Sequence, residues 1–504
     1  MSFYLKSKNL DLGEENDFNV VLNRKDCERL GVREGEVVMI GIGEVELYAD
    51  IVETETEVAE GEIGMFEEIW KGYKINQGDS IFVDIPERSE SLEAISKKLR
   101  GENLTKEDLE LIMRDIGSRK LKETEIAFFV STFFNPGFND DEILWMTKGM
   151  ASSGDILSFK NIHNNGDLVV DKHSIGGVAG KAVTPTLVPI LVAGGLVCPN
   201  TSTRAITSPA GTSDILEVVM PVSLTKDQII DVVKQTGGSL FWGGSLALSP
   251  ADDVIINVER SLKIQEFQKV LVSIVAKKIS MGLTYVLIDL PFGKGTKIES
   301  PDDVEMLDRE FKKLFKKVGI ECETIKRNIK GPDGRSVGPN MEIAEALKIL
   351  ENNPNRSLEL EHVVLDMAAI IFEDTNKVEK GKGKTFARDI LQSGQALEKF
   401  WDIAFAQGAT KKIKSDEIRR GRFVYDLIAK ESGEVKYINN RELVNIARAV
   451  GNPKIKEAGI YVHKMPKEKF VKGDILLTVY ATSEERLENG KTAIHMDELF
   501  GFKK

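Results

Sequence analysis

The sequence predicts a multidomain α/β protein with a small N-terminal β-barrel, a helical domain, a large α/β domain with a mixed or parallel sheet, and a C-terminal α+β domain. Three observations predict this class. Short β-runs fill the N-terminal segment, the hydrophobic period becomes helical after residue 86, and β-runs alternate with helices from about residue 159. A chain of 504 residues is long enough for about three domains of typical size.

Residues 1–86 contain short β-segments separated by turns. β-Branched residues are frequent in FNVVLN (18–23) and GEVVMIGIGEVELYADIVE (35–53). In INQGDSIFVDI (75–85), a Gly-Asp pair comes directly before a predicted strand. The phrase LGVREGEVV (30–38) is similar to one found in double-psi barrels. We therefore expect a double-psi-like β-barrel over residues 1–86, with a small β-sandwich as the alternative.

A polar linker at residues 86–91 leads into a helical domain that we expect over residues 88–158. Thr105, with Asp108 three residues later, predicts a helix N-cap. A later run of about 25 helical residues, 258–283, interrupts the α/β pattern. We expect residues 252–282 to return to the helical domain, so that both domains line a cleft.

An α/β domain is predicted over residues 159–410, and an α+β domain over residues 411–504. The first strand of the α/β domain is expected to run from Leu168 to Val170 and to end at Asp171, before a helix that starts near Thr184. In parallel sheets, ligands bind at the carboxyl ends of the strands, so the loops after the strands are the candidate binding segments.

The composition restricts the class of partner. A net charge of −12 argues against nucleic acid or an anionic membrane as the main partner, so a bound anion needs a local positive pocket. The absence of an 18-residue apolar run and of a signal-peptide core predicts a cytoplasmic protein. Three widely spaced cysteines and five scattered histidines without an HExxH motif lead us to expect no metal and no cofactor.

The stretch VVDKHSIGGVAG (169–180) is the first candidate anion site. Its glycines allow a turn with exposed backbone N–H groups before a helix, and Lys172 and Ser174 add an ammonium and a hydroxyl. His173, next to Lys172, is expected to be neutral at pH 7 and to serve as a hydrogen-bond donor. The alternative is a polar loop without a ligand.

Three further segments offer related chemistry. Residues 199–214 supply seven hydroxyl groups and the guanidinium of Arg204, donors that suit phosphate oxygens. Ser273 and Lys277 share one helix face at i, i+4 spacing, and Lys294 and Lys297 flank a glycine turn. Each segment alone is also compatible with an ordinary solvated surface.

Three motifs in order resemble the family of thymidine and pyrimidine-nucleoside phosphorylases. They are DKHSIGGVAG (171–180), STRAITSPAGTSD (202–214) and GRSVGPNMEIAEAL (334–347), and the likeness covers residues 88–504. The additional N-terminal barrel and the phrase AITSPAGTSD point to the archaeal branch of this family that acts on AMP.

The resemblance implies inorganic phosphate bound by Lys172, Ser174, Ser202 and Thr212, with His173 beside it as a candidate catalytic residue. It implies phosphorolysis of AMP, and of CMP or UMP, to a free base and ribose 1,5-bisphosphate by a homodimer or larger homo-oligomer. The implied contacts to the base or nucleotide are Gly177, Thr203, Arg204, Ala205, Ile206, Thr207, Ser208, Thr212, Ser273, Lys277 and Lys297.

Two departures from the family pattern concern the base. Ile256 and Glu259 stand where the nucleoside enzymes carry a Tyr and an Arg that contact the pyrimidine, which argues against thymidine. Gln265 occupies the position of the proton-donating Asp of the AMP branch, and an amide cannot donate a catalytic proton. Glu266, Asp252 or Asp253 is therefore expected to substitute as the acid, unless the preferred base needs none.

Other functions stay open at this point. A pyrimidine-nucleoside phosphorylase would prefer unphosphorylated nucleosides, and a non-catalytic scaffold would use the barrel for assembly. A related fold serves anthranilate phosphoribosyltransferases, but the loops here lack an acidic pair for a magnesium ion.

Overall fold

The computed structural model describes residues 3–13, 18–43, 45–87, 89–159, 162, 168–180, 182–205, 208–246, 248–262 and 266–503. The chain forms two compact units, one of residues 1–156 and 248–280, the other of residues 157–247 and 281–504. Within these described ranges, no helix combines the length and the apolar character needed to cross a membrane.

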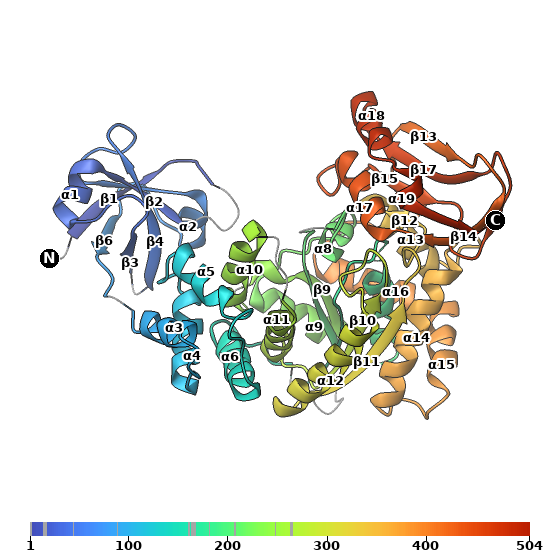
Figure 1. The fold of residues 1–504 in the computed structure, drawn as a ribbon, viewed down its shortest axis with the longest axis horizontal. Helices are drawn as coiled ribbons and strands as arrows, with labels where there is room; N and C mark the ends of the chain where they lie inside the picture. The colour runs from blue at the N-terminus through green and yellow to red at the C-terminus, as the bar shows by residue number, and fades with distance from the viewer. Residues whose placement is uncertain are drawn as a thin grey trace. The chain divides into compact units, whose positions relative to one another are not determined.

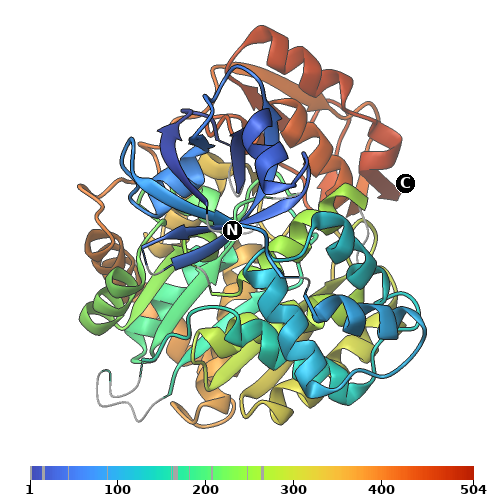
Figure 2. The same cartoon turned by 90° about the vertical axis from the view of Figure 1, so that its left-hand side faces the viewer.

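A closed barrel forms the N-terminal part of the first unit (Figures 1 and 2). Its strands follow the order β1-β5-β2-β4-β3-β6, and both parallel and antiparallel pairs occur among them. Apolar side chains such as Val38 and Ile40 fill the interior. The elements are β1 (Phe3–Asn9), β2 (Asn19–Asn23), α1 (Arg24–Leu30), β3 (Val37–Ile42), β4 (Val45–Thr54), β5 (Glu62–Met65), α2 (Glu67–Gly72) and β6 (Ser80–Asp84).

A helical module completes the first unit. It consists of α3 (Ser91–Leu99), α4 (Lys106–Gly117), α5 (Glu123–Ser131), α6 (Asp140–Ser152), α10 (Pro250–Leu262) and α11 (Phe267–Ser280). Helix α11 packs on α6, and α10 packs on α4 and α5. The predicted cap at Thr105 is confirmed, because the Thr105 hydroxyl accepts from the backbone N–H of Asp108 in a capping box.

A parallel sheet is the centre of the second unit. Strand β10 (Tyr285–Phe292) lies between β7 (Val170–Ser174) and β11 (Glu321–Asn328), and all three run parallel. Strands β8 (Cys198–Ser202) and β9 (Gly238–Trp242) form a parallel pair. An isolated parallel bridge between Val169, just before β7, and Val197, just before β8, connects this pair to the three-stranded sheet. The carboxyl ends of these strands therefore meet at one edge.

Helices enclose the sheet and build a large apolar core with it (Figure 1). They are α7 (Val183–Ala193), α8 (Thr212–Leu216), α9 (Lys226–Thr236), η1 (Gly243–Ser245), α12 (Pro301–Lys317), α13 (Pro339–Leu350), α14 (Leu358–Asp374), α15 (Gly383–Gln392) and α16 (Gln395–Ala406). Helix α7 is buried along almost its whole length, because nearly all of its side chains are apolar.

The C-terminal α+β part carries two small sheets around its own core. One has the order β12-β15-β17-β13 and the other β16-β14-β18. The elements are β12 (Ser336–Val337), β13 (Phe423–Ile428), β14 (Gly433–Ile438), α17 (Asn440–Ala449), β15 (Gly459–Val462), β16 (Lys469–Phe470), β17 (Ile475–Ala481), α18 (Glu484–Thr492), α19 (Met496–Leu499) and β18 (Phe500–Lys503).

The predicted fold class is confirmed, whereas two predicted element boundaries are wrong. Strand β7 does not end at Asp171 but continues to Ser174, because the longer neighbour β10 offers backbone partners up to Asp289. The predicted helical run of residues 258–283 comprises the end of α10 and then α11, and it ends earlier than predicted, at Ser280.

Candidate active site

Strand β7 carries the polar cluster of the first motif inside the sheet. Lys172 and Ser174 lie opposite Leu287 and Asp289 of β10 in the strand register. Lys172 is buried, and His173 and Ser174 are half-buried. The Asp171 carboxylate is buried and accepts a hydrogen bond of 2.6 Å from the side-chain amide of Asn200 on β8. The motif is therefore anchored at the carboxyl edge of the sheet and is not a free polar loop.

An ion-pair cluster supports this strand from the neighbouring strands. Arg327 donates to both carboxylate oxygens of Asp289 at 2.8 Å, and to Asp333 at 2.6 and 3.1 Å. Burial opposes ionisation of Asp289, but Arg327, the charge of Lys172 and a hydrogen bond from Ser174 together lower its pKa. Asp289 thus links the guanidinium to both Lys172 and Ser174.

Sequence reasoning missed this cluster of Asp289, Arg327 and Asp333. One signal was available, because Asp289 is an ionisable residue inside the otherwise apolar run YVLIDLPF of β10. A buried acid in a central strand needs a charged partner. The partner, Arg327, lies 38 residues away in the chain, and nothing local identifies it.

The glycine turn after β7 allows two close backbone approaches. Gly177 has a φ of +87°, and a Cβ atom there would collide with the backbone nitrogen of Lys297. Gly180 has a φ of +71° and lies against Gly334 and Ser336. Glycine is required here because of both the left-handed conformation and the lack of space. The turn is thereby held against the loop of the exposed Lys297.

The loop after β8 is organised by hydroxyl groups and one carboxylate. The hydroxyls of Ser202 and Ser213 are 2.8 Å apart, and Ser202 also donates to the carbonyl of Phe241. Asp214 accepts from the backbone N–H groups of Ala205 and Gly211 at 2.7 Å each. Burial raises the pKa of Asp214, although both backbone bonds oppose this. Thr212, the first residue of α8, is half-buried at this point.

Arg204 is committed to contacts within the protein. Its guanidinium pairs with Glu217 at 2.6 Å and stacks 3.9 Å above the ring of Trp242, which ends β9. Thr203 is exposed, and the Ser208 hydroxyl donates to the carbonyl of Ala210. Two of the predicted contact residues, Ile206 and Thr207, lie outside the described residues.

A second cluster lies in the helical module of the first unit. Asp252 of α10 is fully buried, and its Oδ2 accepts from Ser273 at 2.7 Å and from Lys277 at 2.6 Å. Lys269 lies 3.4 Å from Oδ1 and pairs with Glu259 at 2.7 Å. Burial opposes ionisation, but the two ammonium groups and the Ser273 hydroxyl outweigh it and lower the pKa of Asp252.

The remaining acid candidates differ in their surroundings. Asp253 is half-buried, and burial together with the neighbouring Asp252 raises its pKa to about 6, although Lys277 opposes this. Burial also raises the pKa of Glu266, although backbone hydrogen bonds from the first turn of α11 act to lower it. Gln265, at the expected proton-donor position, lies outside the described residues.

The third family-like stretch, residues 334–347, has structural contacts. Glu345 is buried and accepts from the backbone N–H groups of Arg335 and Ser336, and Glu342 accepts from Gly338. Burial raises the pKa of Glu345 to about 7, against those two hydrogen bonds. The carboxylates therefore fix the backbone against which the glycine turn packs.

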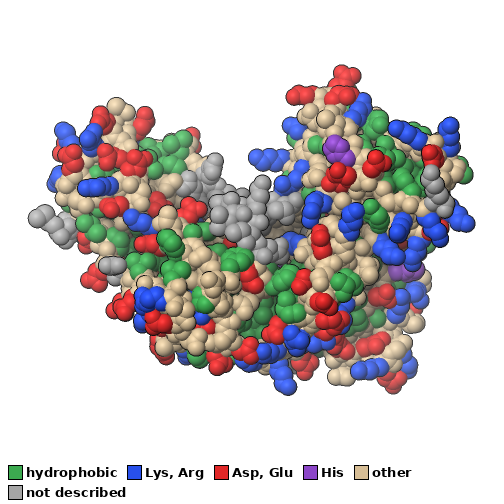
Figure 3. Space-filling view, in the orientation of Figure 1, with side chains coloured by type: hydrophobic (Ala, Val, Ile, Leu, Met, Phe, Trp, Pro, Cys, Tyr) green, Lys and Arg blue, Asp and Glu red, His purple; other side chains and the backbone are tan. Residues whose placement is uncertain are grey.

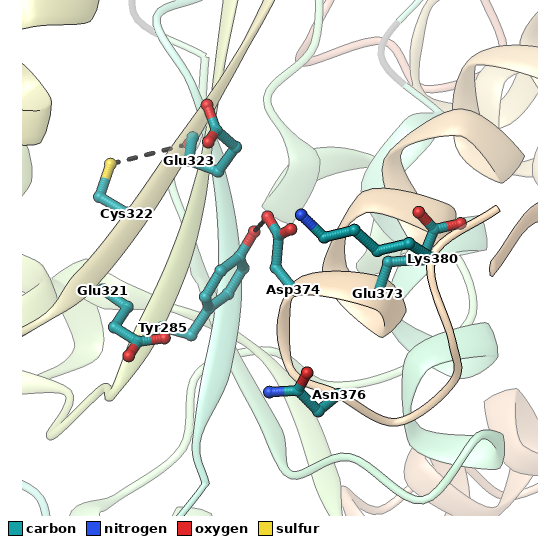
Figure 4. A pocket seen from close by; sticks show the side chains of 8 residues that line it. All are labelled: Tyr285, Glu321, Cys322, Glu323, Glu373, Asp374, Asn376 and Lys380. Carbon is teal, nitrogen blue, oxygen red and sulfur yellow. Dashed lines mark hydrogen bonds between the residues drawn. The ribbon is translucent and has the colours of Figure 1, made fainter. Parts of the chain in front are cut away.

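A cavity of about 340 Å³ lies at the opposite edge of the sheet (Figure 4). Tyr285 and Glu321, the first residues of β10 and β11, line it together with Cys322, Glu323, Glu373, Asp374, Asn376 and Lys380. The Tyr285 hydroxyl donates to Asp374 at 2.9 Å. Its acidic lining does not suit a phosphate. No group of at least three His, Cys, Asp or Glu that could hold a metal occurs in the described part of the chain.

Acidic and basic side chains are interspersed on the face seen in Figure 3. No single-sign patch covers that face.

Comparisons with known proteins agree with this architecture. Residues 166–397 match the "Glycosyl transferase family, a/b domain", and residues 92–154 match its "helical bundle domain". The solved structure of anthranilate phosphoribosyltransferase from Thermus thermophilus has a TM-score of 0.51 and 17% identity, over 63% of this chain and 99% of that one. It shows a shared fold.

Curated relatives cover nearly the whole chain. AMP phosphorylase of Methanococcus maripaludis is 39% identical over 95% of this chain and 93% of its own length. AMP phosphorylase 1 of Archaeoglobus fulgidus is 38% identical over 94% of this chain and 92% of its own length. AMP phosphorylase of Thermococcus sibiricus is 38% identical over 96% of this chain and 94% of its own length. This identity, together with the matched domains, shows that the chain belongs to the AMP phosphorylase family of glycosyl transferases.

Proposed function

We propose that this protein is a pentosyltransferase that phosphorolyses nucleoside 5′-monophosphates, AMP first, with CMP and UMP as further substrates. The relatives named AMP phosphorylase support the substrate class. The observation that carries the proposal is the position of Ser174 and Ser202 at the carboxyl ends of the strands β7 and β8, with Lys172 two residues before the end of β7. A buried ammonium and neighbouring hydroxyls are suited to an inorganic phosphate.

In the proposed reaction, an oxygen of inorganic phosphate attacks C1′ of the ribose while the bond from C1′ to the base breaks. The bonding electron pair leaves with the base, and ribose 1,5-bisphosphate is formed. Phosphate is already an anionic nucleophile, so no serine or cysteine has to be activated. The protein has to orient the reactants and to stabilise charge that develops on the sugar and the base.

Different residues serve the two reactants in this proposal. Lys172, Ser174, Ser202 and Thr212 hold the phosphate, with His173 beside it. Ser273 and Lys277 contact the base, and Gly177, Lys297 and the loop of residues 203–208 contact the nucleotide. Arg204 acts by holding that loop, because its guanidinium is already paired with Glu217 and stacked on Trp242.

The position of Glu259 supports a preference against thymidine. This residue stands where the nucleoside enzymes carry an arginine, and here it pairs with Lys269. A carboxylate in this ion pair cannot donate hydrogen bonds to a pyrimidine carbonyl.

The decisive assay compares AMP, CMP, UMP, adenosine and thymidine, each with and without phosphate. We expect turnover of AMP that depends on phosphate and exceeds that of adenosine and thymidine. Lys172→Met should lower kcat/KM for phosphate at least about 100-fold, because it removes the buried ammonium. Faster turnover of unphosphorylated nucleosides, or a Lys172→Met variant with full activity, would contradict the proposal.

We also propose that the enzyme is a cytoplasmic homodimer or larger homo-oligomer. Phe128 of α5 and Phe134 after it are 59% and 50% exposed, and an apolar surface of this kind favours association. Light scattering of the full chain tests this, and a monomer at micromolar concentration would contradict it.

A further inference from the structure

The glycine turn after β7 (residues 175–180) is held near its end by the C-terminal α+β part of the same unit. The N–H of Ala179 donates to Oδ1 of Asn440 at 2.9 Å, and the Ala179 carbonyl accepts from the N–H of Asp333 at 3.1 Å. Ala179 also belongs to the apolar core of the α+β part. The first anion-site motif is therefore anchored by a residue 261 positions later in the chain.

Asn440 uses both sides of its amide for this anchor. It is the first residue of α17 and is fully buried, and its Nδ2 donates to the carbonyl of Gly331 at 3.2 Å. The N–H of Ala179 can only donate and the carbonyl of Gly331 can only accept, so these two contacts fix which side of the amide faces the turn. Neither a leucine nor a carboxylate at this position can make both hydrogen bonds.

The beginning of the turn is held by strand β10. The N–H of Ile175 donates to the carbonyl of Asp289 at 3.2 Å. The Asp289 carboxylate binds Arg327, which also binds Asp333. Because the N–H of Asp333 holds Ala179, one guanidinium connects the two ends of the turn.

Three successive N–H groups lie between these two ends. The N–H groups of Gly176, Gly177 and Val178 donate to no other group among the residues that the structure describes. Gly176 and Val178 are buried, and backbone N–H groups of buried residues are almost always paired in proteins. Consecutive N–H groups in a turn with positive φ, here +92° at Gly176 and +87° at Gly177, are suited to an anion.

We propose that Asn440 is a positioning residue for phosphate binding: it fixes Ala179, and thereby presents the N–H groups of residues 176–178 to a phosphate group. This inference rests on the proposed phosphorolysis of AMP. The phosphate group is either inorganic phosphate or the 5′-phosphate of the nucleotide, because both offer the same oxygen acceptors. Lys172 and Ser174 come just before the turn, so that one segment supplies an ammonium, a hydroxyl and three N–H donors.

The physical role of Asn440 is to restrict the turn before the ligand binds. Two adjacent glycines give a backbone many accessible conformations. A turn that is already fixed loses little conformational freedom on binding, and the affinity is higher for that reason. Loss of the Asn440 contact should therefore weaken binding of a phosphate group, although Asn440 itself contributes no ligand.

The test measures the affinity of the full-length protein for inorganic phosphate, AMP and adenosine by isothermal titration calorimetry. Asn440→Leu should weaken the binding of at least one of the two phosphate-containing ligands about tenfold. Adenosine, which has no phosphate group, should bind within about twofold of wild type. A loss for inorganic phosphate assigns the turn to that ion, and a loss for AMP alone assigns it to the 5′-phosphate.

Asn23→Leu is the matched control. Asn23 is a buried residue of the barrel whose Oδ1 accepts from the N–H of Lys25 at 3.1 Å and whose Nδ2 donates to the carbonyl of Val58 at 2.8 Å. It therefore has the same bonding pattern as Asn440 and lies in the other unit. We expect a comparable loss of stability in urea denaturation, with wild-type affinity for all three ligands.

A second measurement needs no substitution. Hydrogen exchange of residues 175–180 in the wild-type protein should be slow at Ala179 without ligand, because Asn440 accepts its N–H. Exchange at residues 176–178 should become at least about tenfold slower when saturating phosphate or AMP is added.

The possible outcomes separate this inference from the proposed function. Equal weakening of all three ligands, no weakening of any, or equal effects of Asn440→Leu and Asn23→Leu would overturn the role of Asn440 while leaving AMP phosphorolysis intact. Exchange at residues 176–178 that neither phosphate nor AMP slows would overturn it as well. A wild-type protein without phosphate-dependent turnover of AMP would contradict the proposed function, whereas the titrations would still decide the role of Asn440.

Discussion

Two buried charge clusters, one in each unit, differ in the cation that holds each together. In the α/β unit, Asp289 and Asp333 share the guanidinium of Arg327. In the helical module, Asp252 pairs with the ammonium groups of Lys277 and Lys269. A guanidinium is planar and offers paired donors, whereas an ammonium is a compact charge on a flexible chain.

This difference has a structural and an electrostatic consequence. The bidentate contacts of Arg327 fix strands β10 and β11 in one arrangement beside Lys172 and Ser174. The charge of Lys277, in contrast, acts on two carboxylates and leaves Asp253 with a raised pKa. The bidentate pair therefore restrains backbone position, whereas the ammonium leaves the protonation of a neighbouring carboxyl sensitive to pH.

The largest effect is expected from breaking the arginine cluster. Arg327→Met leaves Asp289 and Asp333 buried without the guanidinium that both contact, and should lower the free energy of unfolding by about 3–5 kcal/mol in urea denaturation. Arg309→Met is the control, because Arg309 is 70% exposed and pairs only with its neighbour Glu310 among the described residues. We expect a change below about 0.5 kcal/mol there. Equal effects of both substitutions would show that the cluster is not a support.

Breaking the lysine cluster should have a smaller effect. Asp252→Asn should lower the free energy of unfolding by about 2 kcal/mol, because the half-buried Lys277 can still reach water. The pKa of Asp252 is lowered in the fold, so its contribution exists above the unfolded value of about 4 and is lost as pH falls below it. The difference from wild type in urea denaturation should therefore be largest near pH 7 and shrink below about pH 4. A difference that grows in acid would contradict this.

The rigidity of the proposed phosphate site can be tested at a single glycine. Gly177→Ala should destabilise by about 1–2 kcal/mol and raise the KM for phosphate, because its Cβ meets the backbone of Lys297 at a positive φ. Gly473→Ala has a similar φ of +97° but open space around it. It should show about 1 kcal/mol of strain and an unchanged KM. An unchanged KM in both variants would mean that the glycine turn does not shape the site.

The smallest and most specific effect concerns Asp253. The pKa of Asp253 is raised to about 6 in the folded protein. The protonated Asp253 side chain therefore stabilises the fold below about pH 4, and this contribution is lost as pH rises through 6. Asp253→Asn should therefore increase the free energy of unfolding by about 1 kcal/mol at pH 7.5 and by nearly nothing at pH 4. Thermal denaturation at both pH values measures this. Destabilisation at pH 7.5 would instead identify Asp253 as an ordinary helix cap.

Much of the fold follows from local patterns in the chain. The barrel strands, the cap at Thr105 and the alternation of strands and helices all rest on periodicity and turn chemistry over a few residues. The end of β7 could not be predicted in the same way. Its last residues are polar, and they stay in the strand because β10 pairs with them from more than 100 residues away.

The residues of the candidate site can likewise be divided into those that local motifs identify and those that only tertiary contacts distinguish. Lys172, Ser174 and Ser202 could be singled out because hydroxyls, an ammonium and glycines cluster in short motifs. Sequence also left Asp252, Asp253 and Glu266 as equal candidates for the acid. Only the three-dimensional contacts distinguish them, because a pKa depends on burial and on charges that lie far away in the chain.

The sequence by itself therefore determined the class of fold, the family and the segments that carry the proposed anion-binding groups. These properties depend on residue type and local spacing, which a single chain displays directly. The tertiary structure alone decided that Arg327 supports the β7 strand, that Arg204 is held by Glu217 and Trp242, and that Asp252 and Asp253 have opposite pKa shifts. Electrostatic interactions act through space over a few ångströms, and which residues come that close is set by packing between distant segments.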